Sequence, residues 1–503
     1  MLTRASVVVL LALIGASGVL STPLPDFRAP KPNLPDLSVT YIERNPQYEG
    51  TQIKWDEIDE GPNGSKGNPA NSKVANPASK KWPAPGEEVV FTAHVRNKGP
   101  VVSAEYDWHW LFDGKEMKHG ISPGLKPNEE ATYDLKWKWD NGDHWVSFEV
   151  DRPWLIDEIS KKNNFVVDQT TALAFHFYVQ QSLYNWFENV KSGLGSYGWE
   201  DWAQFQVREM NRTFRDDIYP SSPEGIKVRV RLDRIVILPD SYKDPGETHA
   251  PESNGTGTAD GVWGFTNGLL EKDKESSKSF YERKPEWLFG PEWPLFHELG
   301  HQLGQPDYYL LPINADRNKA APGVGYWPPH GYEDTMMFSG NWSHDANLGQ
   351  DKVKWDSAYR FWGEHAAAAL NRDLYVRRGF FGNFLVDIPA KQSFKIVDES
   401  GKPLPGAKVE LFRSFSREYG NGSIPEKPAL AGSTDSKGIW MLTRRPYGFI
   451  SNWTANGTLF FRVTSDAKER YGWMNITDFN LEYWRGHKDV GEYTLQVKPK
   501  QQK

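Results

Sequence analysis

The sequence predicts a multidomain chain, with an all-β sandwich at each end and an α+β domain between them. Apolar and polar side chains alternate through residues 86–100 up to a turn, which is the pattern of a half-buried strand. Apolar side chains recur at helical spacing from residue 172, and a strand, turn and strand pattern returns at residues 393–412. A chain of 503 residues is long enough to form three such domains.

Residues 1–21 have the features of a secretory signal peptide. A charged start is followed by an apolar run over residues 5–20, and small residues at 16–18 favour cleavage nearby. Residues 22–36 are rich in proline and predict an extended linker. No later stretch approaches 18 apolar residues and no apolar tail ends the chain. We therefore expect a secreted, extracellular protein without a membrane anchor.

Composition excludes disulfides and argues against one class of partner. The chain has no cysteine, so its stability must come from packed cores alone. The formal net charge is −7 and there is no long basic run. Nucleic acid is therefore not an expected partner.

Residues 37–168 predict the first sandwich, with turn signals at regular spacing and two pairs of tryptophans at i, i+2. This succession resembles the CARDB type of immunoglobulin-like domain, which implies an adhesive or spacing role. Two interpretations of Trp108, Trp110, Trp137 and Trp139 stay open. They either pack in the sandwich core or form an exposed platform that contacts a surface or a polysaccharide.

Residues 170–386 mix helices with strands. The spacing of apolar residues predicts helices over 172–190 and 199–214, and a buried strand over 227–238. A further helix is expected over residues 353–370.

The segment from Phe296, F-H-E-L-G-H, contains the candidate metal-binding and catalytic residues. His297 and His301 are four residues apart, so on a helix both rings project from one face and can bind one Zn²⁺. Glu298 then lies beside the metal, where it can take a proton from a zinc-bound water whose pKa the metal has lowered. This is the machinery of amide hydrolysis.

Gly304 and Asp307 complete the pattern HExxHxxGxxD, which resembles the metzincin zinc peptidases, most of which have His at the last position. The resemblance implies that Asp307 is the third ligand. The downstream sequence D-T-M-M-F-S-G resembles the methionine turn of this family and implies that Met337 lies beneath the metal. The resemblance to the metzincins covers about fifty residues, from the helix to this turn.

Three details of this resemblance are left open. Several family members have a tyrosine two residues after the methionine, where this chain has Ser339, so an oxyanion donor must come from elsewhere. Candidates by proximity are Tyr332, His330 and His344, each of which can equally be structural. The sequence G-V-W-G-F, residues 261–265, is either the edge strand that zinc peptidases use to hold a substrate or an ordinary loop.

Residues 388–498 predict the second sandwich. A strand, the turn D-E-S-G-K-P-L-P-G-A and a second strand resemble the prealbumin-like β-sandwiches that accompany carboxypeptidases and surface proteins. We expect an accessory domain without a catalytic group.

Eight N-x-S/T triplets predict N-glycosylation on exposed loops. Their asparagines are Asn63, Asn211, Asn254, Asn341, Asn421, Asn452, Asn456 and Asn475.

The expected function is therefore that of a secreted zinc endopeptidase acting on a protein or glycoprotein, with Glu298 as general base. The alternative is a non-catalytic secreted adhesion or carbohydrate-binding protein built on an inactive metzincin-like domain.

Overall fold

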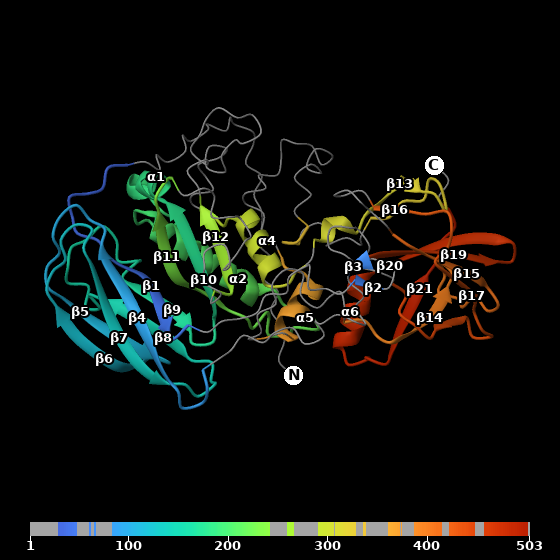
Figure 1. Cartoon of the computed structure of the whole chain (residues 1–503), viewed down its shortest axis with the longest axis horizontal. Coiled ribbons are helices and arrows are strands. Elements are labelled where there is room, and N and C mark those ends of the chain that lie inside the picture. The colour runs from blue at the N-terminus through green and yellow to red at the C-terminus, as the bar shows by residue number, and fades with distance from the viewer. Residues whose placement is uncertain are drawn as a thin grey trace, which may run out of the picture.

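The computed structural model consists mostly of β-strands, with few helices, in three consecutive parts. It describes residues 29–47, 60–61, 65–66, 83–241, 259–265, 290–305, 307–327, 335–338, 361–372, 374, 387–414, 422–447 and 457–500. The first and last parts lie at opposite ends of the molecule, with the histidine-bearing helix between them (Figure 1). The predicted signal peptide and residues 22–28 of the proline-rich linker lie outside these ranges. No helix in the described ranges is long and apolar enough to cross a membrane.

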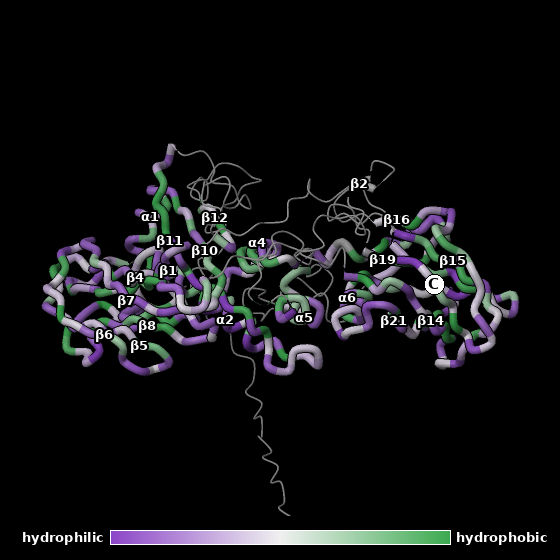
Figure 2. The backbone as a smooth tube through the Cα atoms, turned by 60° about the horizontal axis from the view of Figure 1, so that its bottom comes forward, coloured by the Kyte–Doolittle hydropathy of each residue, from purple (hydrophilic) through white to green (hydrophobic). Residues whose placement is uncertain are grey.

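The N-terminal part is a sandwich of two antiparallel sheets. One has the strand order β1-β4-β7 and the other β6-β5-β8-β9. Buried and half-buried residues alternate along β4, and hydrophobic and hydrophilic stretches are mixed throughout this part (Figure 2). The strands are β1 (Leu37–Asn45), β4 (Glu88–Asn97), β5 (Tyr106–Phe112), β6 (Lys115–Ser122), β7 (Glu130–Lys138), β8 (Trp145–Val150) and β9 (Phe165–Gln169). A separate small hairpin of β2 (Glu60–Gly61) and β3 (Ser65–Lys66) belongs to neither sheet and lies on the side of the C-terminal part (Figure 1).

The paired tryptophans belong to the core of this sandwich. Trp110 and Trp139 are buried, and Trp108 and Trp137 pack against the same apolar cluster. The ring of Trp137 stacks on Phe112 with 3.9 Å between ring centroids. The packed-core interpretation is therefore confirmed, and the exposed platform is wrong for these four residues.

The central part is built on three parallel strands in the order β11-β10-β12. Its strands and helices are β10 (Leu173–Gln180), α1 (Gln181–Trp186), η3 (Phe187–Asn189), α2 (Trp199–Asp216), β11 (Val230–Leu238), β12 (Gly261–Phe265), α4 (Trp293–Gln302), η6 (Tyr308–Leu310), β13 (Ile313–Asn318) and α5 (Glu364–Arg372). Helices α2, α4 and α5 share one apolar core with the sheet.

The helix predicted over residues 172–190 is wrong over its first half. Strand β10 takes Leu173–Gln180, where all eight residues are buried between two parallel neighbours. A strand that is buried on both faces loses the period of two, so its apolar residues also match a helical spacing. The second helix, the strand at β11 and the helical end of residues 353–370 are present.

The C-terminal part is a second sandwich around its own apolar core. Its sheets have the orders β18-β14-β21 and β17-β15-β19-β20. Their elements are β14 (Lys391–Val397), β15 (Lys408–Arg413), β17 (Leu430–Ser433), β18 (Ile439–Leu442), β19 (Thr458–Ser465), β20 (Lys468–Asn475), α6 (Ile476–Trp484) and β21 (Val490–Gln496). Strand β16 (Gly422–Ile424) leaves the sandwich and pairs with β13 of the central part.

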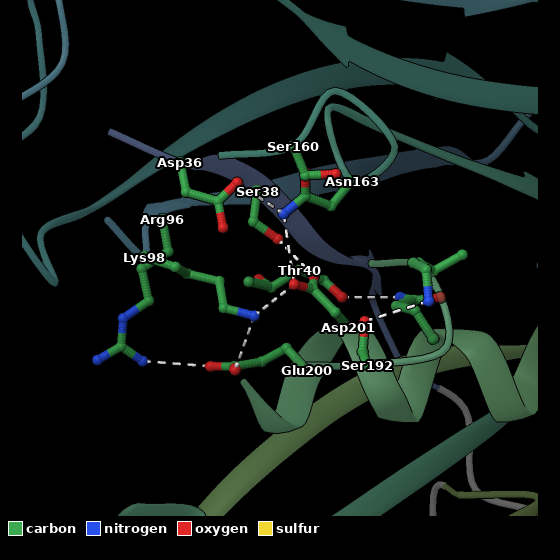
Figure 3. A network of polar contacts seen from close by, with 12 residues as sticks. Asp36, Ser38, Thr40, Arg96, Lys98, Ser160, Asn163, Ser192, Glu200 and Asp201 are labelled. Carbon is green, nitrogen blue, oxygen red and sulfur yellow. Dashed lines mark hydrogen bonds and ion pairs between the residues drawn. The ribbon is translucent and has the colours of Figure 1, made fainter. Parts of the chain in front are cut away.

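The N-terminal sandwich is fixed to the start of α2 by buried charges (Figure 3). Lys98 Nζ lies 2.7 Å from Asp201 Oδ2 and 3.6 Å from Glu200 Oε2. Ser38 Oγ donates to Asp201 Oδ1 at 2.9 Å, and the Asp36 carboxylate is buried close by. All of these side chains except those on α2 come from the sandwich, so the contact joins two domains.

Candidate metal centre

Helix α4 presents His297 and His301 on one face, as their spacing predicts. The two rings are buried and meet edge to face with 4.6 Å between centroids. The helix stops at Leu303, and Gly304 adopts a φ of +91°, a left-handed conformation that favours glycine. The chain thereby turns back and brings Asp307 to the same face.

Three ligand atoms form a nearly equilateral triangle. His297 Nε2 lies 3.1 Å from His301 Nε2, and Asp307 Oδ1 lies 3.2 Å from each of them. Within the described residues this is the one group of three or more such side chains that could hold a metal ion. The structure therefore brings together the three residues that the sequence nominates as ligands.

The second nitrogen of each ring fixes the orientation of the first. His297 Nδ1 is 2.8 Å from Met336 O, and His301 Nδ1 is 2.8 Å from Gln305 O. A carbonyl accepts, so each Nδ1 carries the hydrogen and a neutral ring turns the lone pair of Nε2 towards the triangle. This arrangement is the usual outer shell of histidine ligands.

The triangle fits a tetrahedral metal. Ligand bonds of about 2.0–2.1 Å to zinc place tetrahedral ligands roughly 3.3 Å apart, close to the separations observed here. The charges of these side chains also shift their pKa values. Burial alone would lower the pKa of His301, but the Asp307 carboxylate outweighs it and raises that pKa. The histidines in turn overcome burial and hold the pKa of Asp307 at about 2.

Met337 and Gly300 form the floor of the site. Met337 is fully buried, and a Cβ placed on Gly300 would lie 2.8 Å from its sulfur and 2.8 Å from the Trp362 ring. Gly300 therefore allows the helix to pack directly on the methionine between the two histidines. Met337 therefore packs against the helix that carries His297 and His301.

Glu298 follows His297 on α4 and is half-buried. Its charge contributes, after the larger effect of Asp307, to the raised pKa of His301. The oxyanion candidates Tyr332, His330 and His344, together with Ser339, lie outside the described residues.

Residues 261–265 form strand β12, at the edge of the described part of the sheet. The Gln302 side chain accepts from Val262 N at 2.7 Å and donates to Val262 O at 2.8 Å. The loop alternative is thus wrong, but the main-chain groups of Val262 are occupied and cannot pair there with a substrate.

Sequence reasoning missed Gln302, Tyr308 and His365, which support the site. Gln302 directly follows His301, and the helical spacing of residues on α4 could have indicated that its side chain faces the sheet. Tyr308 O–H lies 2.8 Å from His365 Nδ1, 57 residues further along the chain, and no local pattern indicates that contact.

Of the predicted glycosylation sites, the structure describes Asn211 and Asn475. Asn475 is buried, caps α6 and donates from Nδ2 to Tyr326 Oη at 2.7 Å. Asn211 is half-buried and exchanges two hydrogen bonds with Val230. An exposed glycan is incompatible with the position of Asn475 and would compete with the contact of Asn211. The predicted sites Asn63, Asn254, Asn341, Asn421, Asn452 and Asn456 lie outside the described residues.

Comparison with known proteins concerns the N-terminal sandwich. The CARDB family model matches residues 73–168. These residues are a CARDB domain. Strand β1 precedes the matched segment, yet it pairs with β4 of the domain through residues 37–45. No curated protein matches the chain.

Two solved structures similar to this chain are a crystal and a solution structure of the CARDB domain of one Pyrococcus furiosus protein, the crystal in complex with di-metal ions. The crystal structure is 16% identical over 28% of this chain and 94% of that chain, with a TM-score of 0.19. The solution structure is 15% identical over 27% and 94%, with a TM-score of 0.17. A Bacteroides uniformis β-glucuronidase is 10% identical over 91% and 61%, with a TM-score of 0.16. These TM-scores are too low to establish a common fold.

Proposed function

We propose that this protein is a secreted zinc-dependent endopeptidase with a metzincin-like central domain. The observation that carries the proposal is the triangle of His297 Nε2, His301 Nε2 and Asp307 Oδ1, with sides of 3.1, 3.2 and 3.2 Å. Its size suits zinc, and three protein ligands leave a fourth position for water, as in catalytic rather than structural sites.

The protein's own groups divide the work of hydrolysis. Zinc, when bound, supplies a Lewis acid that lowers the pKa of water and polarises a carbonyl. Glu298 takes the proton of the attacking water and gives it to the leaving amine. The carbonyls of Met336 and Gln305 hold the two rings in the tautomer that leaves Nε2 able to bind metal.

The outer domains suggest where the enzyme acts. The CARDB domain and the C-terminal sandwich, which resembles prealbumin-like domains, suit a protein or glycoprotein substrate on a surface or polymer, by analogy with their families. The apolar start of the chain supports export. Neither sandwich adds a residue to the metal triangle.

Metal content and a single substitution test the proposal. We expect one zinc per chain in protein prepared without chelator, and cleavage of casein or gelatin that Glu298→Ala abolishes while zinc is retained. The loss of activity should exceed about 100-fold, the scale of a missing general base.

A matched control is Glu292→Ala, on the residue that precedes α4. Glu292 is buried, yet five residues from His297 and outside the triangle, so it tests damage to the helix rather than to the chemistry. Wild-type protein without zinc would reject the enzyme and favour the adhesion alternative. Zinc retained with equal cleavage by Glu298→Ala would reject Glu298 as the base.

A further inference from the structure

We infer that the C-terminal sandwich positions the third metal ligand, through a chain of hydrogen bonds from Asn480 to His365 to Tyr308, the residue that follows Asp307. The inference rests on the proposed metal site and adds to it two positioning residues, His365 and Asn480. It gives the C-terminal domain a role in the metal centre rather than in surface contact alone.

The hydrogen-bond chain has one direction. Asn480 Oδ1 lies 3.1 Å from His365 Nε2, and an amide oxygen only accepts, so this nitrogen carries the hydrogen. Burial lowers the pKa of His365 to about 4, against the opposing effect of the Asn480 hydrogen bond, so the ring is neutral. His365 Nδ1 must then accept from the Tyr308 O–H at 2.8 Å. Asn480 Nδ2 donates in turn to Asp387 O at 2.7 Å, which fixes the amide.

All three side chains are withdrawn from water. Tyr308, His365 and Asn480 are exposed by 1%, 3% and 0%. They come from η6, α5 and α6, and the first two belong to the central part while α6 belongs to the C-terminal sandwich. A buried polar group without a hydrogen-bond partner would destabilise the fold, so these hydrogen bonds favour one position of the Tyr308 ring.

Main-chain bonds link Tyr308 to the proposed ligands. Tyr308 N donates to Met337 O at 2.9 Å, and the preceding carbonyl, Met336 O, is the acceptor for His297 Nδ1. Asp307 is joined to Tyr308 by a peptide bond. His297 and Tyr308, the neighbour of Asp307, are therefore held to two consecutive carbonyls, so a displacement of Tyr308 would move Asp307 relative to His297.

Two substitutions interrupt this chain at opposite ends. Tyr308→Phe removes only the hydroxyl, and Asn480→Leu removes the acceptor with little change of volume. We expect each to weaken zinc binding about tenfold, the lower end of the cost of losing an outer-shell partner. The double variant should bind zinc about as weakly as either single variant, because one substitution already interrupts the hydrogen bonds from Asn480 to Tyr308. Competition with a chromogenic chelator gives the dissociation constants.

Thr458→Val is the matched control. Thr458 Oγ1 donates to Leu311 O at 2.7 Å, so this variant also removes a buried hydrogen bond between the same two parts, but outside the Tyr308 chain. It should bind zinc within twofold of wild type. Absorption of bound Co²⁺ is the second readout, and its visible bands should shift in both chain variants and stay unchanged in the control.

The outcomes separate this inference from the proposed function. Wild-type protein that binds neither Zn²⁺ nor Co²⁺ overturns the metal site itself. Wild-type binding with unchanged affinity and spectrum in Tyr308→Phe overturns the positioning role alone. If Asn480→Leu does not fold, Tyr308→Phe decides the question without it.

Discussion

The central part of the molecule is held on its two sides by different kinds of contact. On the N-terminal side, Lys98 faces Asp201 and Glu200, and Arg44 N donates to Asp233 Oδ1 at 3.0 Å, all buried. On the C-terminal side the contacts of His365 with Tyr308 and Asn480 are neutral, and the charged pair next to them, Arg372 Nη1 and Asp387 Oδ2 at 2.9 Å, is partly exposed. Removing one partner of a buried charged contact costs about 3–5 kcal/mol, whereas removing one partner of a buried neutral hydrogen bond costs about 1–3 kcal/mol. The two interfaces should therefore fail in different ways.

Among substitutions at the two interfaces, Lys98→Met should lower the free energy of unfolding most. Burial lowers the pKa of Lys98, but the charges of Asp201, Glu200 and Asp36 outweigh it and keep the ammonium protonated. Without it, buried carboxylates lose their cation, and we expect the free energy of unfolding to fall by about 3–5 kcal/mol. Urea unfolding followed by tryptophan fluorescence measures this. The exposed pair of Lys136 and Glu88 offers the control, since Lys136→Met should leave unfolding unchanged.

The two sides should also respond to pH in opposite directions. Burial and the Asp201 charge raise the pKa of Asp36 to about 7 from its ordinary 3.8. Its protonated form is favoured by folding, so stability should fall as pH rises from about 4 to 7, by up to about 1.4 kcal/mol per unit. Asp36→Asn should flatten that fall, and an unchanged profile would show that other groups dominate the interface.

On the C-terminal side, burial lowers the pKa of His365 to about 4 from 6.5. As the pH falls, this histidine binds a proton at a higher pH in the unfolded chain than in the folded protein. Stability should therefore fall as the pH drops from about 6.5 to 4, again by up to about 1.4 kcal/mol per pH unit. His365→Gln cannot take up that proton and should reduce the slope. A slope equal to that of wild type would contradict the neutral, buried state of this ring.

The smallest effect should come from Thr458→Val. A neutral hydrogen bond between the two parts contributes about 1 kcal/mol, so the urea midpoint should move only slightly. A loss as large as that of Lys98→Met would mean that the two interfaces do not differ as their chemistry indicates.

Local patterns predicted much of this fold. Alternation predicted β4, and a strand, turn and strand pattern predicted β14 and β15. Four-residue spacing placed His297 and His301 on one face of a helix. The failure at β10 came from a strand buried on both faces, where alternation disappears. Asp307 was nominated by resemblance alone, and the structure brings it to the histidines.

Contacts between distant segments could not be predicted in this way. Lys98 and Asp201 are separated by 103 residues, and His365 and Asn480 by 115. A lysine at the end of a strand or an asparagine on a helix is commonly solvated, and only the packing of whole domains buries these side chains. The contacts that join the domains therefore depend on information that no short motif contains.

The pairing of Gln302 with Val262 has a consequence for the behaviour of the protein in solution. An open strand edge presents main-chain donors and acceptors that can recruit a strand from another molecule. In the described part of the sheet, the Gln302 amide imitates one peptide unit of such a strand and occupies the position from within. The helix that carries His297 and His301 thus also protects the edge of the sheet against intermolecular pairing at Val262.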